Sequence, residues 1–287
     1  MAHLVLGYPT LAESLRTAER YIRAGVQVLE LQIPFSHPTA DGPVITAACR
    51  EAVRQGVTTA DCLQAIGELR RRHPEQEMVV MSYVNRIYRF GFSHFAAEMT
   101  RLGIRYLIVP DLPPDDASAR QIAAKDPKTG IHRSGSGPQL VPVLAANVSD
   151  RRLDELLAAG YDFFYLMSDF KITGSTFSLH PRLKAIIARI RSRTGGGVIC
   201  EARAGDTSRQ KIASGEGMSP LLRRDDTSSP GIGIGFGIST PEQARLAAEE
   251  ADLAIIGSAL IRAQEEGRLE IFLEELKNTF PVTTGCS

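Results

Sequence analysis

The sequence has no excess of charge of either sign, because 33 Lys and Arg residues balance 33 Asp and Glu residues. Proteins that bind DNA or an anionic membrane over a broad surface usually carry a basic excess. We therefore expect no nucleic-acid partner and no membrane partner. An anionic ligand would have to be bound locally, by a few groups that converge on it.

Cysteine is scarce, and its spacing excludes the common structural uses of this residue. The four cysteines are Cys49, Cys62, Cys200 and Cys286, which form no CxxC pair and no zinc-type arrangement with histidine. We interpret them as free thiols in a reducing compartment. No stretch approaches the roughly 20 apolar residues of a membrane span. The N-terminal segment MAHLVLGYPT lacks the features of a signal peptide, so we expect a cytoplasmic protein.

Several catalytic motifs are also absent. The six histidines form no HExxH or similar cluster, and we expect no metal site. The sequence has no GxSxG elbow and no Walker loop, so serine-hydrolase and P-loop functions have no support.

What the sequence does contain is a regular alternation of short β-branched runs and longer amphipathic segments. This alternation is typical of βα units around a parallel sheet. Eight such units in 287 residues favour a single-domain (β/α)8 TIM barrel spanning residues 1–287. An open eight-stranded sheet is the alternative. The predicted strands are residues 3–6, 26–33, 78–81, 106–109, 140–144, 163–167, 232–236 and 253–256.

Two polar insertions interrupt this pattern, at about residues 125–137 and 200–230. Their Gly/Ser/Pro-rich composition favours mobile excursions from the barrel. The run 198–200 beside the second insertion could instead form an extra strand. Because this insertion precedes the seventh strand, we expect it at the barrel face opposite the active site, where it would not block catalysis.

Glu30 is the first candidate catalytic residue, because it lies within the apolar strand VLELQIPF. A buried carboxylate is costly unless it is paired or neutral. Alternation places Glu30 on one face with Val28 and Gln32, and the leucines on the other face. The Glu30 face would point into the barrel, where a carboxyl group suits general acid–base catalysis. The alternative is a structural carboxylate satisfied by an internal hydrogen bond.

Asp41 follows in the loop PFSHPTADGP. It could be a second functional carboxylate that orients a donor group of the substrate. Because Asp before Gly is common in turns, a purely local turn role is the alternative. Other polar residues near strand ends, Tyr83, Asn85 and Asp111, could line the pocket or cap turns, and His37 could be a solvated loop residue.

Glycine-rich strand ends predict a phosphate site. The seventh strand ends in GFGIS, which contains Gly237, and the eighth ends at Gly257-Ser258, each just before a helix. Phosphate sites in barrels form from these two loops and a helix N-terminus, where backbone N–H groups meet the anion. A third glycine, Gly174, follows Thr173 in the loop after the sixth strand.

Together these motifs resemble the α subunit of tryptophan synthase. The most specific part is LELQIPFSHPTADGP, which is similar to the second-strand signature of that family. Supporting matches occur in the same order along the chain: GYP at 7–9, SYVN at 82–85, PDLP at 110–113, ITG at 172–174, GFGIS at 235–239 and GSAL at 257–260.

The resemblance implies retro-aldol cleavage of indole-3-glycerol phosphate to indole and glyceraldehyde 3-phosphate. It implies that Glu30 is the acid–base residue and that Asp41 holds the indole N–H. The resemblance implies that Tyr83, Tyr165, Thr173 and Phe236 bind the substrate. It also implies that the phosphate is bound by Gly174, Gly237, Gly257 and Ser258.

The resemblance also implies no cofactor in this chain, and a pyridoxal-phosphate β subunit as partner in an α2β2 complex. The sequence departs from the family pattern at Gln32, where glycine is usual, and at His37, where aspartate is usual. It also begins at the first strand, without the preceding helix that is usual in the family.

The alternatives to this function are a stand-alone lyase that releases indole, a non-catalytic binding barrel, or another phosphate-binding barrel. A Schiff-base aldolase is disfavoured because Lys171 lies in a loop rather than at a strand end.

Overall fold

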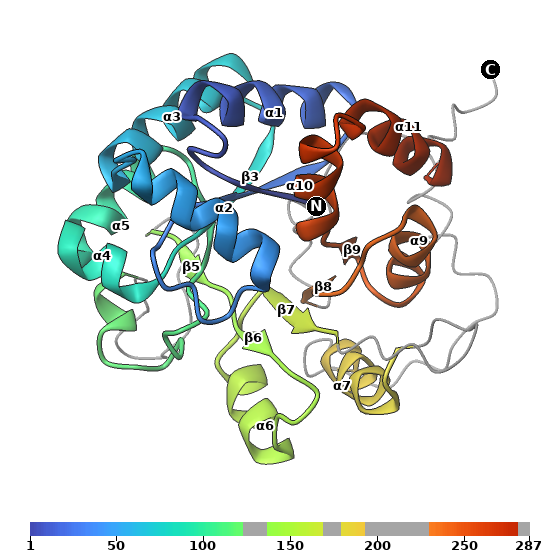
Figure 1. Cartoon of the computed structure of the whole chain (residues 1–287). Coiled ribbons are helices and arrows are strands. Elements are labelled where there is room, and N and C mark those ends of the chain that lie inside the picture. The colour runs from blue at the N-terminus through green and yellow to red at the C-terminus, as the bar shows by residue number, and fades with distance from the viewer. Residues whose placement is uncertain (123–136, 169–178, 193–229, 281–287) are drawn as a thin grey trace.

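The computed structural model describes residues 1–122, 137–168, 179–192 and 230–280 (Figure 1). Strands occupy the centre and helices surround them (Figure 1). The strands are β1 Ala2–Val5, β2 Val28–Gln32, β3 Glu77–Met81, β4 Tyr106–Ile108, β5 Gln139–Leu140, β6 Val143–Leu144, β7 Phe163–Met167, β8 Gly231–Gly235 and β9 Leu253–Ala254. The helices are α1 Leu11–Arg23, α2 Pro43–Arg54, α3 Thr59–Arg72, α4 Val84–Phe90, α5 Phe92–Arg101, α6 Asp150–Ala158, α7 Pro181–Arg191, α9 Pro241–Glu250, α10 Ser258–Glu265 and α11 Leu269–Thr279, with a 3-10 turn η1 at Ala119–Gln121.

The strands pair in chain order and are all parallel. One sheet runs from β1 to β5 and a second from β6 to β9. A parallel bridge between Ala2 of β1 and Ile256, two residues beyond β9, closes the ring of strands. The N–H of His3 donates to the carbonyl of Ile256 at 2.9 Å across this junction. This order confirms the predicted TIM barrel.

The fifth predicted strand is divided in two, which is the main correction to the expected elements. The N–H of Val141 still donates to Leu107 of β4, whereas the carbonyl of Pro142 accepts from Tyr165 of β7. Because proline has no N–H, the hydrogen-bond ladder is interrupted at this point. The two short strands β5 and β6 therefore together occupy the position of one barrel strand.

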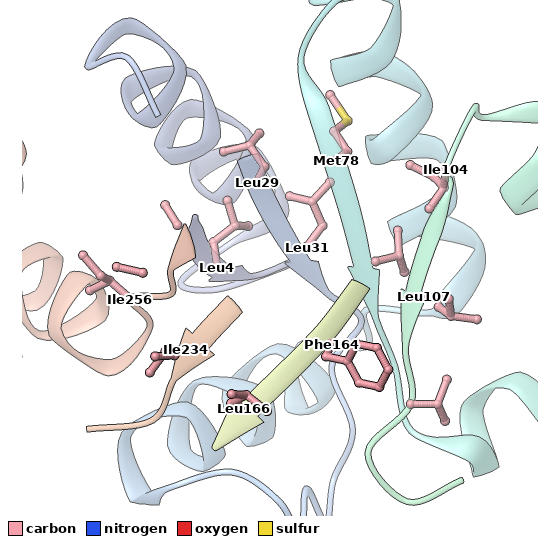
Figure 2. Close-up of a cluster of buried hydrophobic side chains, with 14 of the residues drawn as sticks. Leu4, Leu29, Leu31, Met78, Ile104, Leu107, Phe164, Leu166, Ile234 and Ile256 are labelled. Atoms are coloured by element: carbon pink, nitrogen blue, oxygen red, sulfur yellow. The ribbon is translucent and has the colours of Figure 1, made fainter. Parts of the chain in front are cut away.

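Alternating side chains divide the apolar core into two layers. Leu29 and Leu31 of β2 belong to the large cluster between strands and helices, and Figure 2 shows them beside Leu4 and Met78. Val28 belongs instead to a smaller cluster inside the barrel. The prediction that the leucine face of β2 packs on helices is thus confirmed, and Glu30 shares the inward face.

Local signals place the helix starts. The side chain of Thr10 accepts from the N–H of Glu13 at the start of α1, and Thr240 caps α9 in the same way through Gln243. Helix α4 was not expected from the sequence. A carboxylate oxygen of Asp111 accepts from the N–H of Val84 at 2.9 Å, so a residue from the next βα loop supports the first turn of α4.

In the described part of the chain, no helix combines the length and apolar character needed to cross a membrane.

Candidate active site

A group of polar side chains lies inside the barrel on its first two strands. Glu30 of β2 has only 4% of its surface exposed. His3 of β1 is its neighbour in the strand register. Nδ1 of His3 lies 3.5 Å from Oε1 of Glu30. A carboxyl group and an imidazole are therefore in contact where little water can reach them.

Asp41 is held in place by two side chains at the carboxyl ends of adjacent strands. Nε2 of Gln32, the last residue of β2, donates to Oδ2 of Asp41 at 2.6 Å. The hydroxyl of Tyr83, just after β3, donates to the same oxygen at 2.9 Å. This hydroxyl also accepts from the N–H of Ala40 at 3.0 Å. Asp41 is thus fixed at the mouth of the barrel by contacts that a local turn does not require.

Burial governs the protonation of these groups. It raises the pKa of Asp41 above its ordinary value, and the opposing effects of His3, Gln32 and Tyr83 do not cancel it. Burial, with Asp41 beside it, also raises the pKa of Tyr83 well above the ordinary range. The pKa of Tyr165 is raised by burial and then by the nearby carboxyl groups. Both tyrosines therefore stay neutral hydrogen-bond donors.

Three buried polar atoms of this group have no hydrogen-bond partner within the described residues. They are Nε2 of His3, Oε2 of Glu30 and Oε1 of Gln32. An unpaired polar atom away from water costs free energy unless a ligand or an ordered water satisfies it. The three side chains come from the adjacent strands β1 and β2, so a polar ligand or an ordered water beside these strands could satisfy their unpaired atoms.

The opposite side of the barrel interior carries aromatic rings. The ring of Tyr165 on β7 meets the ring of Phe236 edge to face, with centroids 5.8 Å apart. Phe236 has a φ of 68°, a left-handed conformation that is rare for a side chain of this size. The hydroxyl of Ser168 donates to the carbonyl oxygens of both Gly235 and Phe236, which holds this turn against β7.

The turn after β8 and the start of α10 contain the glycines expected to bind phosphate. Gly237 has a φ of 85°, which glycine adopts without strain. Gly257 is the N-cap of α10, and Ser258 is its first residue. The N–H groups of a first helical turn have no partner within the helix and favour an anion. The geometry of both elements therefore suits a phosphate group.

The described residues contain no group of three or more His, Cys, Asp or Glu side chains arranged to hold a metal ion. The functional groups available in this site are carboxyl, imidazole, amide, phenol and backbone N–H.

Sequence comparison identifies the family. The sequence model described as "Tryptophan synthase alpha chain" matches residues 1–199 and 192–279. This chain belongs to the tryptophan synthase alpha chain family. It is therefore a lyase of the tryptophan synthase type.

Individual relatives agree with this assignment. The tryptophan synthase alpha chain of Dehalococcoides mccartyi is 31% identical over 97% of this chain and 94% of its own length. That of Chloroflexus aurantiacus is 30% identical over 91% of this chain and 82% of its own length. Among solved structures, a tryptophan synthase chain from M. tuberculosis superposes with a TM-score of 0.71 at 25% identity, covering 97% of this chain and 90% of that one.

The structure brings most of the sequence-predicted site residues of this alpha chain to one end and the interior of the barrel. Glu30, Asp41 and Tyr83 lie around the polar group, and Tyr165 with Phe236 lies across from them. The predicted residues Thr173 and Gly174 lie outside the described residues, as do Lys171 and nearly all of both insertions.

The weaker candidates have local roles. Asn85 is exposed, and Asp111 supports the start of α4 as already described. His37 is exposed in its loop, and its Nδ1 lies 2.9 Å from the hydroxyl of Ser36. The description of His37 as a solvated loop residue is consistent with this contact.

Two polar residues of the site were missed by sequence reasoning. His3 was treated only as the start of a strand, although strand alternation places it on the same face as Val5, opposite to Leu4 and Leu6. That alternation could have identified it. Ser168 directly follows a strand, and nothing in the sequence indicates that its hydroxyl reaches two carbonyl groups of the β8 turn.

Proposed function

We propose that this chain cleaves indole-3-glycerol phosphate to indole and glyceraldehyde 3-phosphate, with Glu30 as the acid–base residue. The observation that carries the proposal is the buried Glu30 carboxyl group, whose Oε2 has no protein partner among the described residues, in the same barrel interior as the fixed Asp41. A binding site for a phosphorylated ligand alone would not require two carboxyl groups of this kind.

The reaction needs two proton movements and one bond cleavage. Carbon 3 of the indole ring gains a proton, and the hydroxyl group on the adjacent glycerol carbon loses one. The electron pair of the bond between these two carbons returns to the ring, and the hydroxyl carbon becomes the aldehyde of glyceraldehyde 3-phosphate. A single carboxyl group beside both positions can give one proton and accept the other, and we assign this role to Glu30.

Asp41 is assigned to the indole nitrogen. As the ring is protonated at carbon 3, positive charge develops on this nitrogen, and a carboxylate that accepts its N–H stabilises that charge. Gln32 and Tyr83 both donate to Oδ2 of Asp41, so we assign Oδ1 to the substrate. Two donors that fix the carboxyl group in advance reduce the reorganisation needed during the reaction.

The phosphate of the substrate is assigned to the backbone around Gly237, Gly257 and Ser258, which the geometry of the β8 turn and of the α10 start supports. Gly174 is assigned to the same group, and Thr173 to the substrate, from the sequence motif ITG alone. Tyr83, Tyr165 and Phe236 would then surround the ring end of the substrate.

The family further supports a partner and a compartment. We infer that this chain pairs with a tryptophan synthase β subunit in an α2β2 complex in the cytoplasm. The pyridoxal phosphate of that complex would belong to the β subunit, and this chain would carry no cofactor of its own.

The test is indole release from indole-3-glycerol phosphate by the purified chain, alone and with a β subunit, beside Glu30→Gln. We expect activity that rises with the partner and falls by about 1000-fold or more in Glu30→Gln. Glu77→Gln is the matched control, because Glu77 is also buried but begins β3 at the other end of the barrel. High activity without the partner would favour a stand-alone lyase. No activity from folded protein in either case would refute the proposal and favour a binding role.

A further inference from the structure

His3 occupies a central position in the barrel interior. Its side chain and that of Glu30 are each about 5% exposed, and the two face each other from neighbouring strands. A Cβ atom added at Gly257 would lie 3.4 Å from Cδ2 of His3. The imidazole ring thus lies between the Glu30 carboxyl group and the start of α10, where the phosphate end of the site is proposed.

The charged and titratable groups around His3 come from several elements. Glu30 of β2 and Asp41 of the following loop both act on it electrostatically. Tyr165 of β7 faces the same two carboxyl groups and remains a neutral phenol. The amino group of Met1 also acts on Glu30, but burial lowers its pKa to about 5. Near neutral pH, His3 is therefore the group in this cluster that can supply a positive charge.

The balance of effects on His3 favours its protonated form. Burial by itself would lower the pKa of the imidazole. The attraction of Glu30 and the contact with it outweigh burial, and Asp41 and the nearby amide of Gln32 act in the same direction. The net result is a raised pKa, as expected for a histidine that gains a carboxylate partner.

We propose that His3 is the positioning residue for Glu30, holding Oε1 of its carboxyl group in an ion pair and leaving Oε2 to face the substrate. This inference rests on the proposed function. Without a partner, a buried carboxyl group could rotate and present either oxygen. With Oε1 engaged by Nδ1 of His3, Oε2 is the free atom of Glu30, and the group enters the reaction already oriented.

A merely structural role for His3, filling space beside α10, predicts different behaviour from a positioning role. A space-filling residue could be replaced by phenylalanine without changing how the rate depends on pH. A positioning residue could not.

The first experiment measures the ionisation of His3 by NMR in the isotope-labelled full chain, with His3→Gln used to assign its signals. We expect the midpoint of the His3 titration to lie above about 6.5 and to fall by about one pH unit in Glu30→Gln. An unchanged midpoint in Glu30→Gln would overturn the proposal. This readout needs no turnover, so it separates failure of the proposal from failure of the proposed function.

The second experiment measures kinetics of indole release with a β subunit present. We expect His3→Phe to lower kcat by about 30-fold with KM changed less than about threefold, and His3→Gln, which keeps a donor, to recover most of the loss. Wild-type kcat/KM should decline as pH rises through the pKa of His3, and His3→Gln should lack that decline. His94→Gln, at an exposed position of α5, is the control and should match wild type.

A double variant completes the test. If His3 acts through Glu30, adding His3→Phe to Glu30→Gln should not lower the residual rate further. A further loss of the same size as in the single variant would overturn the proposal, as would a His3→Phe enzyme with wild-type kcat and pH profile. Absence of turnover in the wild type would refute the proposed function, while the NMR result would still decide whether His3 holds Glu30.

Discussion

Tyr165 and Gly235 lie so close together that residue 235 has no room for a side chain. A Cβ atom built on Gly235 would lie 2.7 Å from Cζ of Tyr165, and it would lie even closer to the hydroxyl oxygen of Tyr165. Because the two residues come from adjacent strands, β7 and β8, and share the interior of the barrel, the absence of a side chain at one sets the position of the ring at the other.

Gly235→Ala should therefore displace the Tyr165 ring. Because a backbone-anchored methyl group cannot move away, the ring must shift toward the substrate space, and we expect kcat/KM to fall by at least about tenfold. Combining it with Tyr165→Leu, which removes the ring, should restore thermal stability relative to Gly235→Ala alone.

The control for this variant is Gly67→Ala in the interior of α3. There an added Cβ meets the ends of two flexible side chains, Leu102 at 3.2 Å and Arg71 at 3.8 Å, and alanine favours the helix by about 1 kcal/mol. Its Tm should be equal to or above that of the wild type. Full activity of Gly235→Ala would contradict the stated dependence of Tyr165 on Gly235.

Tyr83→Phe should weaken the hold on Asp41. It removes one of the two donors to Oδ2 and leaves the N–H of Ala40 without its acceptor. We expect a loss of about 1–2 kcal/mol in the free energy of unfolding and a fall of about tenfold in kcat/KM for indole release. Tyr88→Phe, at a side chain that is 68% exposed, should change neither. Wild-type kinetics in Tyr83→Phe would show that Gln32 alone suffices to fix Asp41.

Asp41→Asn should abolish most of the activity yet stabilise the fold at pH values above the ordinary pKa of an aspartate. Burial raises the pKa of Asp41 in the folded state, so the folded protein holds this proton more tightly than the unfolded chain does. Stability is therefore full below the unfolded pKa and declines as pH rises toward the folded pKa. Asparagine cannot lose a proton, so the Tm advantage of the variant should grow with pH over this window.

Asp61→Asn is the control, because the pKa of Asp61 is shifted in the opposite direction to that of Asp41. Hydrogen bonds from Thr58 lower the pKa of Asp61, so its contribution to stability is present at higher pH and is lost as pH falls through the lowered pKa. The Tm of Asp61→Asn should lie below that of the wild type near neutral pH and approach it in acid. Parallel pH profiles for the two variants would contradict the assigned direction for Asp41.

Ser168→Ala tests whether the β8 turn is held from β7. The substitution removes a hydroxyl that donates to the carbonyl of Gly235 at 2.7 Å and also to that of Phe236. We expect a loss of about 1–3 kcal/mol in stability, and a rise in KM for indole-3-glycerol phosphate larger than the fall in kcat, because the turn is assigned to phosphate. Ser192→Ala, whose exposed hydroxyl donates to the local carbonyl of Arg189, should leave KM unchanged.

The barrel and the orientation of its second strand could be predicted from the sequence alone. The βα alternation predicted the strand order, because each unit has its own apolar period and turn residues. Period-2 alternation in VLELQIPF was enough to send Leu29 and Leu31 to the helices and Glu30 to the interior. The proline that divides the fifth strand was visible in the sequence, but its effect depended on which neighbours its backbone could pair with.

Which side chains contact one another depends on the tertiary structure. His3 and Glu30, which are in contact, are 27 positions apart in the sequence. Tyr83, which donates to Asp41, lies 42 positions after it. The two carbonyl groups that accept from the Ser168 hydroxyl lie 67 and 68 positions further along the chain. Local propensity carries no information about such distances, because strand register and barrel closure fix them after the chain has folded. For this reason the sequence could name the two carboxyl groups and Tyr83 as site residues, while the structure was needed to show that His3 contacts Glu30 and that Gln32 and Tyr83 hold Asp41.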